Sequence, residues 1–213
     1  MCFSPQASFG ATALLSVLGG TALKRTKQSR YVLIALIPLM FGVQQALEGF
    51  VWLALQRGDT TSLWYTIPVY GFLFFAAVWW PLYIPIMLWY LETVPSKKQW
   101  LIMPVVAGVI VALIALLHTC FTSIEAVAIG HHISYQQTTP PMGGEILYNI
   151  GLGAYLIATA GALFISSIRY TWLMGIIVVV AFATAQLWYY LAFGSVWCFF
   201  AAIASSLIVL VVG

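Results

Sequence analysis

Polar side chains are rare in the apolar part of this chain, and several of them occur in one short stretch. Gln44 and Gln45 precede Glu48 by four and three residues, and Trp52 follows it by four. On an α-helix these spacings place all four side chains on one face. A charged residue at membrane depth costs about 2.5–3.5 kcal/mol on insertion scales and usually marks a functional site. We therefore expect a site that binds a proton, an ion or a small ligand, centred on Glu48.

Other polar residues are expected at the same depth. Glu48 lies about 12 Å below the outer end of its predicted helix, at about 1.5 Å per residue. Gln186 falls at a similar depth in a later apolar segment, whereas Cys2, Ser4 and Cys198 fall near the outer ends of the first and last segments. Together these residues predict an outward-facing polar pocket, used for transport or sensing. The alternative is a structural contact between helices, because interhelical hydrogen bonds also stabilise membrane bundles.

The cysteines leave two interpretations open. Cys2, Cys120 and Cys198 all map to the outer side, where an oxidising compartment would permit a disulfide, and Cys2 with Cys198 is the first pairing to test. Equally, all three can be small buried thiols. A membrane redox protein is therefore an alternative function.

Three histidines permit a metal-site hypothesis. His131 and His132 are adjacent in sequence, and His118 ends an apolar segment on the same side. Zinc or copper would suit such ligands. The chain contains no HExxH or CxxC motif, so no particular metal or cofactor is identified, and no catalytic triad or phosphate-binding loop points to an enzyme.

The composition sets the class of protein. The 213 residues are 63% hydrophobic and 6% charged, with a mean hydropathy of +1.02, whereas soluble domains carry about 25% charged residues. The apolar runs are continuous, as in membrane helices, and do not alternate as in membrane barrels. We predict an all-α polytopic membrane bundle in contact with the lipid bilayer. Nucleic-acid binding is excluded, and an oligomer stays possible.

Seven apolar segments are each near the roughly 20 residues that a membrane-spanning helix needs. The third contains Pro68, Pro81 and Pro85 and is expected to be kinked. A long outer loop, residues 122–144, separates the fourth segment from the fifth. The whole chain, 1–213, is predicted to be one transmembrane domain, with helices at about 5–23, 31–56, 63–91, 100–121, 145–167, 170–193 and 195–212.

The basic residues predict the orientation. Seven of the eight Lys and Arg residues lie in three loops on one side of this seven-helix arrangement, and only Arg57 lies on the other side. The positive-inside rule places these loops in the cytoplasm, the N-terminus outside and the C-terminus inside. The expected location is a bacterial inner membrane.

Three stretches carry a resemblance to a known family. They are Met1-Cys2-Phe3-Ser4 with Ala7-Ser8-Phe9, the run Gln44-Gln45-Ala46-Leu47-Glu48-Gly49, and Val196-Trp197-Cys198-Phe199-Phe200-Ala201-Ala202. As a set they resemble an uncharacterised family of bacterial seven-helix membrane proteins, known only as a domain of unknown function. The resemblance covers essentially the whole chain. It implies the same topology and no activity, so a structural or assembly partner without a ligand stays a third possibility.

Overall fold

The computed structural model describes residues 4–137, 144–188 and 192–211. Within those ranges, six helices are long and apolar enough to cross a membrane, namely Pro5–Arg25, Ser29–Gln56, Leu63–Leu91, Pro95–Phe121, Ile146–Ile165 and Thr171–Trp188. A further apolar helix, α11 (Phe193–Ser205), has only 13 residues. These helices support a multi-pass membrane protein. The count of seven spans and the orientation stay predictions.

The outer loop differs from the all-α prediction. Its first part forms a hairpin of two strands, β1 (Ile124–Ile129) and β2 (His132–Gln137), which pair with each other. Gly130 takes a φ of +59° in the two-residue turn between them, a conformation that a hairpin turn of this length requires. The apolar stretch of β1 therefore lies in a strand, within the segment that was predicted to be an outer loop.

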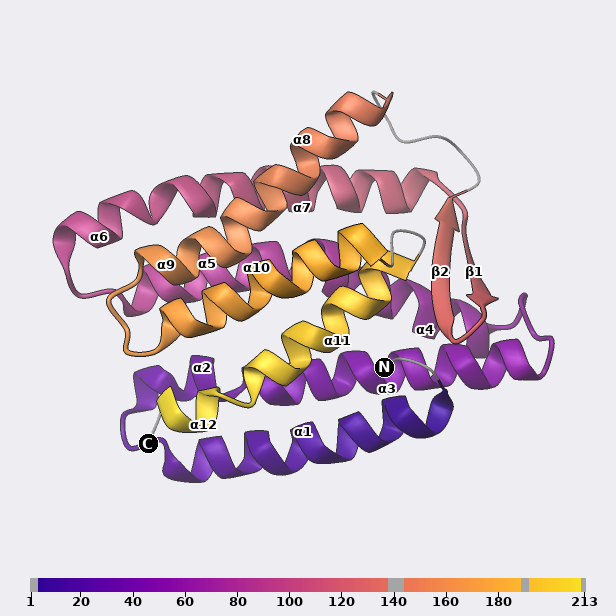
Figure 1. Ribbon diagram of the computed structural model, residues 1–213, viewed down its shortest axis with the longest axis horizontal. Coiled ribbons are helices and arrows are strands. Elements are labelled where there is room, and N and C mark those ends of the chain that lie inside the picture. The colour runs from indigo at the N-terminus through magenta and orange to yellow at the C-terminus, as the bar shows by residue number, and fades with distance from the viewer. Residues whose placement is uncertain (1–3, 138–143, 189–191, 212–213) are drawn as a thin grey trace. The chain divides into compact units, whose positions relative to one another are not determined.

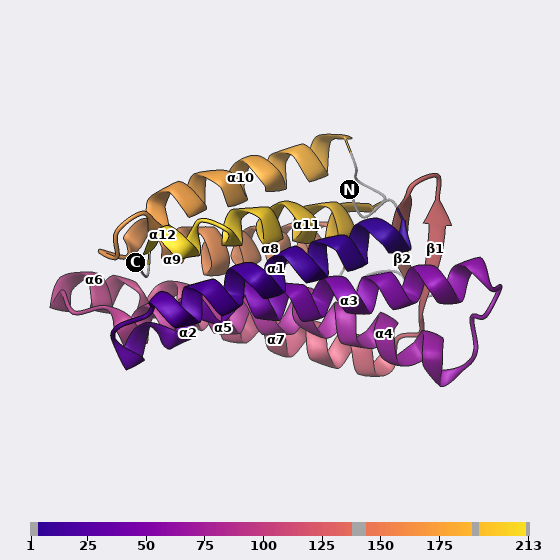
Figure 2. The same ribbon diagram turned by 90° about the horizontal axis from the view of Figure 1, so that it is seen from below.

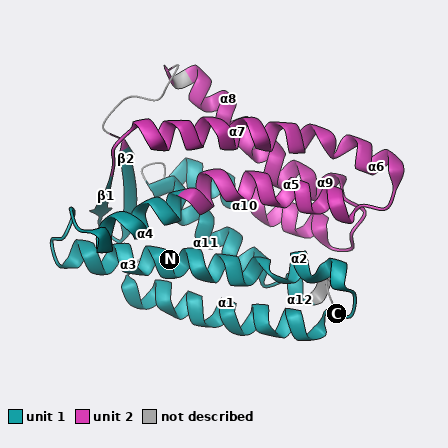
Figure 3. Cartoon of the chain, turned by 180° about the vertical axis from the view of Figure 1, so that it is seen from behind, with its two compact units in different colours: residues 1–73, 125–136, 180–213 teal, residues 74–124, 137–179 magenta. Residues whose placement is uncertain are grey.

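The chain forms two compact units, which Figure 3 shows in different colours. Unit 1 contains residues 1–73, 125–136 and 180–213, and unit 2 contains residues 74–124 and 137–179. The long helix Leu63–Leu91 passes from unit 1 to unit 2 at Phe74, and α10 (Thr171–Trp188) returns to unit 1 at Val180. Each unit is described separately below.

Unit 1 is built around two adjacent helices, α1 (Pro5–Arg25) and α3 (Ile37–Gln56), which Figures 1 and 2 show side by side. The Thr12 hydroxyl donates to the Gly42 carbonyl across this pair, at 3.2 Å. A Cβ on Gly49 would lie 2.9 Å from the end of the Phe9 ring, so a larger residue at position 49 would force that ring to shift. The unit's elements are α1 (Pro5–Arg25), η1 (Ser29–Tyr31), α2 (Val32–Ala35), α3 (Ile37–Gln56), α4 (Leu63–Leu73), the hairpin, the end of α10, α11 and α12 (Ile208–Val211).

The hairpin is fixed to α4 by three kinds of contact. The Ala126 amide donates to the Tyr65 hydroxyl oxygen at 2.7 Å, and the Tyr135 ring stacks on Phe72 with centroids 4.8 Å apart. Ile133 is fully buried beneath the sheet. The hairpin is therefore a packed part of unit 1.

Unit 2 contains η2 (Phe74–Trp79), α5 (Trp80–Leu91), α6 (Pro95–Trp100), α7 (Ile102–Phe121), α8 (Gly144–Leu156), η3 (Ile157–Gly161), α9 (Ala162–Ile165) and the start of α10. Both η2 and η3 are π-helical. In a π-turn the carbonyl of residue 76 would pair with the amide of residue 81, but that residue is Pro81 and has no N–H. The Tyr155 hydroxyl donates to the Ala76 carbonyl instead, at 2.5 Å.

Pro85, one of the three prolines of the third predicted segment, also leaves a backbone carbonyl without its helical partner in unit 2. Pro85 has no N–H, so it cannot pair with the carbonyl of Pro81, four residues earlier. Gly108 of α7 lies against that carbonyl so closely that a Cβ at position 108 would overlap it, and the Pro85 ring would be 3.4 Å away. A Cα–H···O contact is the kind of interaction such an approach allows.

Candidate functional site

The polar residues of α3 form the buried centre of unit 1. The side chains of Gln44, Gln45 and Glu48 each have 0% exposure. Helical spacing accounts for this arrangement, because residues three and four apart share one face. This face carries two amides and a carboxyl, whereas the rest of α3 is apolar as far as Gln56 at its end.

Helix α11 supplies the second half of the arrangement. The Ser195 hydroxyl donates to Glu48 Oε1, and Gln45 Nε2 donates to Glu48 Oε2 at 3.5 Å. Cys198, one turn after Ser195, has its thiol beside Glu48 with the Gln44 side chain as hydrogen-bond partner. We call these five residues, Gln44, Gln45, Glu48, Ser195 and Cys198, the Glu48 cluster.

No positive side chain is buried with this cluster. All eight Lys and Arg residues lie in described parts of the chain, and each is exposed or half-buried. A buried carboxylate without a cation is strongly disfavoured, because its charge loses the solvation of water. A proton or a bound cation at Glu48 would remove this cost.

Two buried oxygen atoms of unit 1 lack a hydrogen-bond partner among the described residues. They are Gln45 Oε1 and Ser8 Oγ, and the Ser8 side chain is 1% exposed on α1. An amide can turn over and exchange its oxygen for its nitrogen. Gln45 could then accept a hydrogen bond from a protonated Glu48, where it now donates one.

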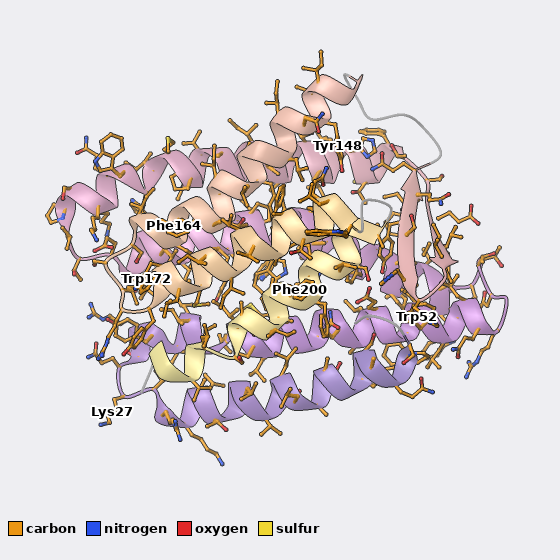
Figure 4. The ribbon with its side chains drawn as sticks, viewed as in Figure 1. Lys27, Trp52, Tyr148, Phe164, Trp172 and Phe200 are labelled. Atoms are coloured by element: carbon orange, nitrogen blue, oxygen red, sulfur yellow. The ribbon has the colours of Figure 1, made fainter. Side chains whose placement is uncertain are left out.

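The other predicted pocket residues take different places. Trp52 packs in a hydrophobic group with Tyr65, Ile133 and other apolar side chains, next to the hairpin (Figure 4). Ser4 caps α1, since its Oγ accepts from the Ala7 amide at 3.2 Å. Gln186 is half-buried on α10, and the described residues give it no hydrogen bond to the Glu48 cluster.

The cysteine and histidine predictions have separate outcomes. Cys2 lies outside the described residues, Cys198 is a buried free thiol and Cys120 is an exposed one. His118 is half-buried at the end of α7 in unit 2, whereas His131 and His132 lie at the hairpin turn in unit 1. Among the described residues, no three His, Cys, Asp or Glu side chains are grouped as metal ligands.

Sequence reasoning missed Ser195, although a signal existed. Ser195 and Cys198 are three residues apart, so they share a helix face. Cys198 was already a predicted member, and the serine hydroxyl was the nearest polar group on its face.

A second buried carboxyl, Glu92, was also missed. Glu92 follows the end of α5 in unit 2 and is 3% exposed. Its Oε1 accepts from the Thr93 amide at 3.0 Å, from the Val94 amide at 2.9 Å and from the Ser167 hydroxyl at 2.5 Å. Its Oε2 accepts from the Ser167 amide at 2.7 Å. The carboxyl thus joins the loop after α5 to the loop after α9.

Glu92 is stabilised as an anion. Burial raises the pKa of its carboxyl, but the hydrogen bonds from Ser167, Val94 and Thr93 outweigh burial and hold that pKa below its usual value. Backbone amides can only donate, and a carboxylate can only accept, so these partners favour the charged form.

One protein family matches the chain. The model described as "Family of unknown function (DUF6629)" covers residues 1–213, which confirms the resemblance inferred from the three stretches. No curated protein and no solved structure matches the chain.

Proposed function

The chain belongs to this family of unknown function, and we propose that it is a proton-binding membrane protein in which Glu48 carries the proton. The observation that supports this proposal is the complete burial of Glu48, whose carboxyl accepts hydrogen bonds from two neutral groups, the Ser195 hydroxyl and the Gln45 amide. Intramembrane carboxyl groups of this kind commonly serve as proton relays.

The size of the cluster favours a proton over a larger ligand. Gln44, Gln45, Glu48 and Ser195 are all fully buried, and both carboxyl oxygens already contact protein donors. A bound molecule would have to displace these contacts. A proton would only change which partner donates, because the serine hydroxyl and the Gln45 amide can each donate or accept.

A small dehydrated cation is the second candidate, favoured by the oxygen-rich composition of the cluster. Glu48, Gln45 and Ser195 offer hard oxygen ligands, and Gln45 Oε1 has no donor in the described residues. Such ligands suit alkali and alkaline-earth ions. The proton is the better candidate because it requires no empty space between the side chains.

In the cell, such a site would serve proton-coupled transport or pH sensing. We propose the N-terminus-outside orientation, supported by the concentration of basic residues in three loops. Glu48 then lies in the outer half of the membrane, and the site exchanges its proton with the outside.

Infrared spectroscopy tests the protonation state directly. Purified protein at neutral pH is expected to show a protonated-carboxyl band that is lost in Glu48→Gln and retained in the control Glu125→Gln, which alters an exposed residue of β1. A carboxylate band that disappears with Glu48→Gln at neutral pH would contradict the proton proposal. If that carboxylate band also shifts when sodium replaces choline in the buffer, the cation candidate would be supported instead.

Proteoliposomes test whether the proton moves. A pH-sensitive dye inside the vesicles should report proton entry after an external acid pulse in wild-type protein and in Glu125→Gln. The Glu48→Gln variant should lose most of this entry. Unchanged entry in Glu48→Gln would remove Glu48 from a transport role and leave sensing as the remaining use of its proton.

A further inference from the structure

We propose that the loop end of unit 2 binds the headgroup of an anionic phospholipid. The site consists of Lys97 and Lys98 on α6 together with Arg169 in the loop between α9 and α10. We call this set the unit 2 basic site. It is separate from the Glu48 cluster, which belongs to unit 1, and it does not depend on the proton proposal.

Glu92 holds the two loops of this site together. Its carboxyl accepts hydrogen bonds from Thr93 and Val94 in one loop and from Ser167 in the other. Arg169 comes two residues after Ser167, and α6 begins three residues after Glu92. Charges that are distant in sequence are thereby held at one end of unit 2.

The same bonds leave the cations available. Glu92 is the only acidic residue in residues 92–100 and 166–170, and four donors in its own loops already occupy its oxygens. The three basic side chains therefore have one acidic residue in these loops, and the oxygens of that residue are already hydrogen-bonded to other groups. This is the charge arrangement that attracts a phosphate group.

Aromatic rings lie beside these cations, as they do at the headgroup level of a membrane. Lys98 Nζ lies 4.7 Å from the centre of the Trp89 ring, and Arg169 Cζ lies 4.5 Å from that of Tyr170. Trp100 and Trp172 are 67% and 52% exposed at the same end of the unit, and Figure 4 labels Trp172 there. Exposed Trp and Tyr side chains collect at the membrane–water boundary.

The backbone around Arg169 is also constrained. Tyr170 has a φ of 68°, in the left-handed region that residues other than glycine seldom adopt. The Thr171 hydroxyl donates to the Ile168 carbonyl at 2.8 Å, and the Ile168 amide donates to Ser166 Oγ at 3.2 Å. Arg169 is thus presented from an ordered turn, which lowers the entropy lost when it binds a phosphate.

Native mass spectrometry of detergent-purified protein provides the test. Phosphatidylglycerol should bind the wild-type protein more tightly than phosphatidylcholine does. The triple variant Lys97→Gln, Lys98→Gln, Arg169→Gln should weaken phosphatidylglycerol binding on the order of a hundredfold, since each basic residue near a lipid surface contributes about fivefold. The double variant Lys97→Arg, Lys98→Arg should bind as the wild type does, because it keeps both charges.

The matched control removes three exposed cations from unit 1, with Lys24→Gln, Arg25→Gln and Lys27→Gln. This control should keep the tight phosphatidylglycerol site. Equal weakening by both triple variants would overturn the proposal, because it would show attraction by net charge alone. Displacement of the lipid by equimolar glycerol phosphate would also overturn it, by assigning the site to a free phosphate. Circular dichroism establishes that each variant is folded.

Discussion

Glu48 in unit 1 and Glu92 in unit 2 are the same kind of side chain at nearly the same burial, 0% and 3% exposed. Their partners differ. Glu48 is bonded to the hydroxyl of Ser195 and the amide of Gln45, whereas three of the four bonds to Glu92 come from backbone amides. One carboxyl lies within a helix that is long and apolar enough to cross a membrane, and the other lies just beyond the end of such a helix.

The difference shows that burial alone does not decide the charge of a carboxyl. Backbone amides are obligatory donors, so they are satisfied only by an acceptor such as a carboxylate. Hydroxyl and amide side chains can either donate to a carboxylate or accept a hydrogen bond from a protonated carboxyl group. The surroundings of Glu92 therefore stabilise a permanently ionised carboxylate. We expect those of Glu48 to allow its carboxyl to bind and release a proton.

Matched Glu→Gln variants would separate these two roles most strongly. Glu92→Gln places an amide NH₂ against backbone donors and removes charge-assisted bonds, so we expect it to lower the free energy of unfolding by about 2–3 kcal/mol. Glu48→Gln replaces a neutral acid by a neutral amide of the same shape and should cost less than about 1 kcal/mol. Denaturant unfolding in mixed micelles measures both, with the exposed Glu125→Gln as the control. A larger loss for Glu48→Gln than for Glu92→Gln would break the comparison.

The pH dependence of stability provides a second test. The pKa of Glu92 is lowered in the folded protein, so its contribution to stability is complete above the unfolded pKa of about 4.3. The contribution is lost as the pH falls through the folded pKa, by about 1.4 kcal/mol for each unit of difference between the two values. Unfolding midpoints measured between neutral and acidic pH should fall in wild-type protein.

The same series in Glu92→Gln is the control for this assignment. Its stability should fall less steeply over the acidic range, because the variant has no carboxyl at position 92. Parallel curves for the two proteins would mean that another group causes the acid sensitivity.

Removing the serine hydroxyl that bonds to each carboxyl is expected to give the smallest difference between the two sites. Ser167→Ala removes a donor to a carboxylate and should lower the free energy of unfolding by about 1.5 kcal/mol. Ser195→Ala removes a donor to Glu48 and should cost about 1 kcal/mol if Glu48 is neutral. Only Ser195→Ala should shift the infrared band of the protonated carboxyl. A shift of that band in Ser167→Ala would refute the assignment of the band to Glu48.

Helical spacing was enough to predict that Gln44, Gln45 and Glu48 share a face, because that relation is local. The pairing of Glu48 with Ser195 was not predictable, since 147 positions separate them and their meeting depends on how α11 packs on α3. Glu92 was missed because it falls just outside the predicted third helix, 63–91, and the search for buried acids was confined to the apolar segments. Its position after a helix and among basic loops was the available signal.

The hairpin and the last helix show a similar limit. The alternation of β1 is weak, as its buried residue Ala126 is small, so the strand was not distinguishable from a loop by periodicity. The last segment was drawn as one helix over residues 195–212, but the structure bends it at Ser206 between α11 and α12. The Ser205-Ser206 pair at this point was the available local signal, since such pairs are a common cause of helix bends.

The contact between Gly108 and the Pro81 carbonyl has a consequence for how the sequence can vary. Pro85 releases that carbonyl from the helix ladder, and Gly108 makes room for it. Alanine at position 108 should be tolerated only in a chain whose residue 85 has an N–H, because the helix can then draw the carbonyl back toward its own axis. Among relatives of this chain, positions 85 and 108 are thus expected to change together, so a pair of co-varying positions would record this contact.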